Sequence, residues 1–169
     1  YLIETSLRGC FVSMKKRNPI GIFDSGIGGL TVGYQIAKLM PNERLVYFGD
    51  TKHLPYGDKS AEAIKTYSKN ITKFLLEHNC KMILIACNTA SALAFKEVKE
   101  CCENLAIPVN VIDPVVNFTN HFTNKIVGII GTKNTIFSDV YALKIKNKNP
   151  LIKVSSLATP LLVPMIEEG

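Results

Sequence analysis

The chain has 169 residues, a hydrophobic share of 47% and a formal net charge of +6. This length fits one domain, or one domain and part of another, and no apolar run approaches the roughly 20 residues that a membrane-spanning helix needs. We therefore expect a soluble globular protein that does not insert into a membrane.

The cysteine and charge patterns bear on the compartment and the partners. An odd count of five cysteines without paired C-x-x-C spacing argues against a disulfide framework and a metal site, and it favours the reducing cytoplasm. Apart from the cluster Lys144, Lys146 and Lys148, the lysines are spread among acidic residues. No aromatic and basic stripe accompanies them, so we expect a solvated surface rather than nucleic-acid binding.

Residues 1–13 show neither a helical nor a strand period, and Met14-Lys-Lys-Arg17 follows them. We interpret 1–13 as an upstream or non-native segment and Met14 as the native start. A secretory signal is the poorer alternative, because charged residues interrupt its apolar part. A first α/β domain is then predicted over 14–113.

The first strand is predicted over 19–24, and it leads through the glycine-rich loop 25–29 into a helix over 30–40. The glycines allow a close approach of the backbone to a ligand, and the helix N-terminus offers N–H groups to an anion. Asp24 and Ser25 at this strand end either cap the turn or face a small polar ligand. Both interpretations stay open at this point.

A second strand is predicted over 44–50, and a loop rich in turn formers separates it from a long helix over 58–79. In this loop, His53 is interpreted as a solvated residue rather than a base. Tyr56 and Gly57 are more suggestive, since a tyrosine beside a glycine offers both a wall and a backbone N–H to a ligand.

The apolar run 81–86 predicts a buried parallel strand that ends in Cys87, and a helical pattern continues from Thr89 to Cys102. Cys87 is therefore expected where open α/β sheets bind ligands. A helix N-terminus lowers the pKa of a thiol and favours a reactive thiolate, whereas burial favours an inert, space-filling cysteine. The residues alone leave both interpretations open.

A fourth strand is predicted over 107–112, with a turn or boundary at Asp113-Pro114. From residue 125 the chain then repeats the order of strand, glycine loop and helix, with the strand over 125–131, the loop over 132–135 and the helix through about 145. Residues 150–156 predict another strand. Half a sheet over this length buries little core, so we expect a partial second domain over 114–169. The predicted fold class is α/β, with two similar domains, each a mainly parallel sheet flanked by helices, and with the second truncated.

Several motifs follow one another in order along 19–169: Gly21–Gly29, Tyr47–Asp50, Leu54–Gly57, Ala86–Ser91, Gly128–Thr132 and Pro160–Gly169. Together they resemble bacterial glutamate racemase, a cofactor-independent amino-acid racemase of the aspartate and glutamate group. The resemblance implies two α/β domains with the active site between them. It also implies a cytoplasmic isomerase that interconverts L- and D-glutamate for peptidoglycan synthesis without a cofactor or metal.

The resemblance further implies roles for individual residues. Racemisation removes the α-proton from one face of the carbon and returns a proton to the other, and in this family two thiols do so. Cys87 matches the first thiol, Asp24 an acid that interacts with the substrate ammonium, and Glu167 a further acid, with Glu168 as the alternative. The matching substrate-binding positions are Asp24, Ser25, Tyr56, Gly57, Asn88, Thr89 and Thr132.

The chain departs from the family pattern because no cysteine follows Cys102, whereas a second thiol is expected beyond residue 169. Cys101 and Cys102 do not replace it, since one continuous helix would carry them about 20 Å from Cys87. We expect this chain to be inactive or impaired alone. The alternatives are a racemase for aspartate or another amino acid, and a non-enzymatic glutamate-binding fragment. A homodimer is the candidate assembly.

Overall fold

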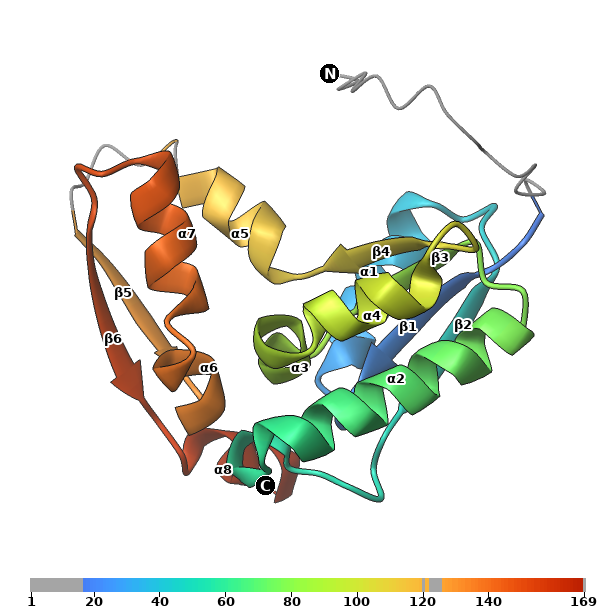
Figure 1. Ribbon diagram of the computed structural model, residues 1–169, viewed down its shortest axis with the longest axis horizontal. Helices are drawn as coiled ribbons and strands as arrows, with labels where there is room; N and C mark the ends of the chain where they lie inside the picture. Colours follow the sequence, from blue (N-terminus) through green and yellow to red (C-terminus); the bar gives the residue numbers. More distant parts are fainter. Residues whose placement is uncertain (1–16, 120, 122–125, 169) are drawn as a thin grey trace.

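The computed structural model describes residues 17–119, 121 and 126–168, and it describes side chains up to residue 166. The predictions for 1–13 and for Met14 lie outside these residues. Two units form the molecule, and the helices α3 and α6 lie between their sheets (Figure 1). In the described part of the chain, no helix combines the length and apolar character needed to cross a membrane.

The first unit is built on a four-stranded parallel sheet with strand order β2-β1-β3-β4. Its strands are β1 (Ile20–Asp24), β2 (Leu45–Gly49), β3 (Met82–Ile85) and β4 (Ile107–Asn110). The register pairs Asp24 with Gly49, and Phe23 with Ile85. Because parallel strands point the same way, the residues that follow them, including Asp50 and Cys87, gather at one edge of the sheet.

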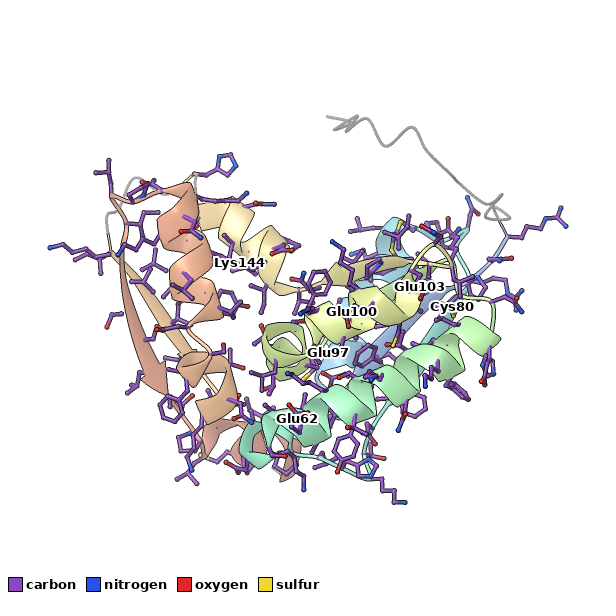
Figure 2. The ribbon with its side chains drawn as sticks, viewed as in Figure 1. Glu62, Cys80, Glu97, Glu100, Glu103 and Lys144 are labelled. Atoms are coloured by element: carbon purple, nitrogen blue, oxygen red, sulfur yellow. The ribbon has the colours of Figure 1, made fainter. Side chains whose placement is uncertain are left out.

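Helices cover both faces of this sheet, as its buried strands require. Helix α1 (Gly29–Leu39) packs through Val32 and Ile36 on one face, against Ile20 and Ile22. On the other face, Phe23, Ile83 and Ile85 pack against α2 (Ala61–Glu77) and α4 (Phe95–Cys102). Lys65 of α2 binds Glu62 and Glu97, which extend from α2 and α4 in Figure 2. The α/β fold class is confirmed.

The single helix predicted after Cys87 is wrong. The chain forms α3 (Asn88–Leu93) and then α4, with a break at Ala94, where φ is −124° and ψ is 4°. No glycine or proline stands at this break, so tertiary packing overrides the helical pattern. The side chain of Ala94 is fully buried. The break turns α4 to run beside α2 while α3 stays at the sheet edge (Figure 1).

The second unit contains a two-stranded parallel sheet, β5 (Ile126–Gly131) and β6 (Lys153–Ala158). Its helices are α5 (Ile112–Thr119), α6 (Lys133–Phe137), α7 (Val140–Lys148) and α8 (Leu162–Glu168). The buried residues of its core are Ile112, Val116, Ile145 and Ile152. On β5, Ile126 and Ile130 are exposed, because the described helices leave the outer face of this sheet uncovered.

Two local predictions for the second unit are corrected. Asp113 and Pro114 do not form a turn: they lie in the first turn of α5, where proline is tolerated because its missing N–H has no helical partner. The helix predicted after β5 is divided into α6 and α7 at Asp139, whose φ of 56° is left-handed. The domain boundary at residue 113 stays a prediction.

Candidate active site

A cavity of about 270 Å³ lies where the carboxyl edge of the first sheet meets the second unit. The predicted site residues that line it are Asp24, Ser25, Tyr56, Gly57, Cys87, Asn88, Thr89 and Thr132. The structure therefore brings these positions together, although their chemical roles stay predictions. Glu167 lies in α8 with its side chain outside the described part, and Val163 of the same helix lines the cavity.

The first wall of the cavity comes from the turn between β1 and α1. Asp24 is 6% exposed, and its Oδ2 accepts a hydrogen bond from the Gly26 N–H at 3.0 Å. A Cβ at Gly29 would lie 2.6 Å from the Cβ of Asp24 and 2.9 Å from that of Ala86. Glycine at this position therefore lets α1 begin directly against the strand ends.

The Cys87 thiol lies at the floor of the site as the N-cap of α3. Its Sγ accepts a hydrogen bond from the Ala90 N–H at 3.4 Å and lies 3.5 Å from the Ser25 hydroxyl, to which it donates. Burial and the nearby Asp24 carboxylate raise the pKa of Cys87, and the contacts with Ser25 and Ala90 oppose this in part. In this structure burial therefore outweighs the lowering of the pKa that a helix N-terminus can cause.

A hydrogen-bonded network behind the cavity holds Tyr56 in place. The Tyr56 hydroxyl donates to Asp50 Oδ2 at 2.6 Å, and His53 Nδ1 donates to Asp50 Oδ1 at 2.8 Å. Burial and the hydrogen bond to Asp50 raise the pKa of Tyr56, so its hydroxyl stays protonated. The His53 ring stacks on Tyr67 and does not line the cavity. His53 is thus a partner of Asp50, rather than the freely solvated residue that was predicted.

Hydroxyl and amide groups join the two units beside the cavity. The Thr89 hydroxyl lies 2.9 Å from that of Thr132 and 3.3 Å from that of Thr135. Asn134 Nδ2 donates to the carbonyl oxygens of Tyr56 at 3.0 Å and of Lys59 at 2.8 Å. A Cβ at Gly57 would lie 2.9 Å from the Cβ of Thr132, so the absence of a side chain there permits this close contact.

Tyr47 supports the glycine loop from the neighbouring strand. Its hydroxyl donates to the Gly26 carbonyl oxygen at 3.1 Å. Burial raises the pKa of Tyr47 to about 12, together with the charge of Asp24 and the charge that Cys87 carries once it is ionised. The group therefore remains a hydrogen-bond donor at neutral pH.

Several residues at this site were not predicted from the sequence. Thr31, Val32 and Val163 line the cavity, and Asn134 and Thr135 join the units. Thr31 and Val32 lie in the first turn of the helix that follows the glycine loop, and this position in the sequence could have indicated them. No local pattern marks Asn134, because its partners lie more than 70 residues earlier in the chain.

A second, larger cavity of about 500 Å³ adjoins the first and shares Asn88, Thr132 and Val163 with it. Its lining is mostly apolar and comes from α5, α7 and β5. Within the described residues, no group of three or more His, Cys, Asp or Glu side chains is arranged to hold a metal ion.

Similar proteins were found by sequence and by fold, although no protein-family model matches the chain. Glutamate racemase 3 of Caldanaerobacter subterraneus subsp. tengcongensis is 47% identical over 152 residues, 89% of this chain and 54% of the relative. The glutamate racemase of Geobacter metallireducens is also 47% identical over 152 residues, with 89% and 55% covered. The crystal structure of glutamate racemase from Francisella tularensis in complex with D-glutamate superposes with a TM-score of 0.85 at 46% identity.

This chain is similar to glutamate racemases. The Francisella glutamate racemase match covers 90% of this chain and 57% of that structure. The chain spans about half the length of the curated relatives it matches. The similarities in sequence and in fold therefore lead to proteins with the same name, glutamate racemase.

Proposed function

We propose that this chain contributes a glutamate-binding site and the first proton-transfer thiol of a cofactor-independent glutamate racemase. The observation that carries the proposal is the cavity in which Cys87, Asp24 and the polar groups of both units meet. The similarity to glutamate racemases, one of them solved with D-glutamate, supports this choice of substrate. The product of the complete protein would supply D-glutamate for peptidoglycan.

In the proposed reaction, Cys87 as thiolate takes the α-proton of D-glutamate onto Sγ and leaves a carbanion at the α-carbon. A second acid on the opposite face then protonates this carbanion to give L-glutamate. With no electron sink, the carbanion depends on hydrogen bonds and charges fixed in the site. Asn88, Thr89 and Thr132 offer such groups to the carboxylates, and Glu167 is proposed as a further acid.

The charge balance of the site suggests how the thiolate forms. Burial and the Asp24 carboxylate both favour the neutral thiol of Cys87. A substrate ammonium beside Asp24 would offset the charge of that carboxylate and would favour the thiolate, since an opposite charge stabilises the ionised form. Binding of the amino acid would therefore favour the Cys87 thiolate, which is the base that removes its α-proton.

This chain holds one thiol of the proposed pair. No cysteine follows Cys102, and neither Cys80, Cys101 nor Cys102 lines the cavity. One base exchanges a proton on one face of the α-carbon but does not deliver a proton to the other. We therefore propose that these residues alone exchange the α-proton without normal inversion.

The test follows deuterium uptake and inversion of D- and L-glutamate in heavy water, using the chain and the Cys87→Ala variant. Cys80→Ala is the matched control, because Cys80 precedes β3 and lies at the far end of the sheet from α3 (Figure 2). We expect uptake from one enantiomer without inversion, lost in Cys87→Ala and retained in Cys80→Ala. Uptake that persists in Cys87→Ala would refute the role of this thiol.

The same exchange experiment, repeated with aspartate and other amino acids and combined with a binding measurement, separates the alternatives. A racemase for aspartate or another amino acid would exchange the α-proton of that compound faster than that of glutamate. A non-enzymatic glutamate-binding fragment would bind glutamate without any exchange. The polar groups around Cys87 favour the racemase over the binding fragment, because they place a titratable thiol inside the cavity.

A further inference from the structure

Tyr141 of α7 reaches across from the second unit to the site. Its hydroxyl donates a hydrogen bond of 2.6 Å to Oδ1 of Asn88, the first residue of α3. Asn88 lines both cavities, whereas Tyr141 lines the larger one. The contact therefore lies at the point where the two cavities meet.

The direction of this hydrogen bond determines which groups of the Asn88 side chain remain for a ligand. A carboxamide has one acceptor oxygen and two N–H donors on its nitrogen. Burial raises the pKa of Tyr141, so its hydroxyl keeps its proton and engages the oxygen. Asn88 Nδ2 forms no hydrogen bond with any residue that the structure describes. Its two donors are thus left for a ligand.

The Tyr141 ring is held by packing rather than by the hydrogen bond. It contacts the core of the second unit formed by Ile112, Val116, Ile145 and Ile152, and Ala92 of α3 packs against the same core. The hydroxyl is therefore held at a fixed position relative to α3. A side chain whose rotamer is locked by packing can impose its orientation on a more exposed partner such as Asn88.

We propose that Tyr141 is a positioning residue that orients the Asn88 carboxamide, so that its N–H groups bind a carboxylate of the amino acid in the cavity. This inference rests on the proposed function for the identity of the ligand. It adds a residue of the second unit that acts through Asn88 and does not itself touch the ligand.

The test measures D-glutamate affinity by calorimetry for the chain, Tyr141→Phe, Asn88→Ala and the double variant. Loss of one oriented hydrogen bond is expected to weaken binding about fivefold to tenfold in Tyr141→Phe. Because Tyr141 acts through Asn88, the double variant should bind no more weakly than Asn88→Ala alone. Tyr34→Phe is the matched control, since Tyr34 is 66% exposed on α1.

Additive losses in the double variant, or unchanged affinity in Tyr141→Phe, would overturn the inference. A second readout is the NMR signal of the Asn88 side-chain amide, which should shift in Tyr141→Phe and stay in place in Tyr34→Phe. If the unmodified chain binds no glutamate, the proposed function fails for this chain. The amide signal then tests separately whether Tyr141 orients the Asn88 carboxamide. An unshifted signal in Tyr141→Phe would refute this role of Tyr141.

Discussion

Cys87 is 6% exposed at the end of β3, and the negative charge of the Asp24 carboxylate acts on its thiol. Both burial and this charge raise the pKa of the thiol, so the protonated form dominates at neutral pH. A protonated thiol is the form that donates a proton to a carbanion. The opposite role, removal of a proton, requires a change in local charge.

The effect of Asp24 on Cys87 is directly testable. In Asp24→Asn, the carboxylate charge is removed, so the pKa of Cys87 should fall and its thiolate fraction should rise at a given pH. Alkylation of Cys87 by iodoacetamide, measured by mass spectrometry at pH 8, should therefore be faster than in the unmodified chain. Glu77→Gln, an exposed change on α2, should leave the rate unaltered. An equal or slower rate in Asp24→Asn would contradict this electrostatic coupling.

The Tyr56 hydroxyl contributes to stability as well as to the wall of the cavity. Asp50 is buried, and Tyr56→Phe would remove a donor from its Oδ2. A buried carboxylate that loses a hydrogen bond is expected to lower the free energy of unfolding by about 1–3 kcal/mol. Urea denaturation measures this change, with Tyr34→Phe as the control. Equal stability of the two variants would show that Asp50 finds another donor.

At the scale of the elements, much of the fold could be predicted from the sequence, and the reasons are local. Apolar runs that end in Asp24, Asp50 and Cys87 place the strands of the first sheet correctly, because buried parallel strands leave a strong apolar pattern. The breaks at Ala94 and Asp139 could not be predicted from that pattern. They arise where packing between helices determines the direction of the chain.

Helix α2 offers a matched pair of serines for testing its stability. Ser60 is the N-cap and its Oγ accepts from the Ala63 N–H, whereas Ser68 is buried and its Oγ has no hydrogen-bond partner among the described residues. Ser60→Ala should lower the free energy of unfolding by about 1 kcal/mol. Ser68→Ala should raise it by roughly 1 kcal/mol, since an unpaired buried hydroxyl is unfavourable. Urea denaturation curves that shift in the same direction for both variants would contradict this difference.

For the whole molecule, the arrangement of two units around one cavity determines the candidate site. Three hydrogen bonds join the units at this site: Thr89 with Thr132, Asn88 with Tyr141, and the Tyr56 carbonyl with Asn134. The sequence predicts the strand-end residues of this site, since each follows an apolar run. It does not predict Tyr141 or Asn134, because their partners are distant in the chain. The homodimer and the incomplete second domain stay predictions.

The buried thiols and phenols make stability depend on pH. Burial raises the pKa of Cys80 and Cys87, and it raises the pKa of Cys102 and of Tyr47 to about 12. In the unfolded chain these groups have lower pKa values and ionise at lower pH. Between the pKa values of the unfolded chain and those of the folded chain, the unfolded state therefore binds fewer protons. The free energy of unfolding should therefore fall as the pH rises above about 8.5.

Urea denaturation between pH 7 and pH 10 measures this dependence. Stability that is constant or increasing over this interval would contradict the burial of these groups in their neutral forms.

The central claim is that Cys87 lies within a glutamate-binding cavity. The most direct measurement is the rate at which iodoacetamide modifies each cysteine peptide, with and without D-glutamate. Cys101, which is partly exposed and does not line the cavity, is the internal control. We predict that D-glutamate slows modification of Cys87 and leaves Cys101 unchanged. Equal modification of Cys87 in the presence and absence of saturating D-glutamate would contradict the claim.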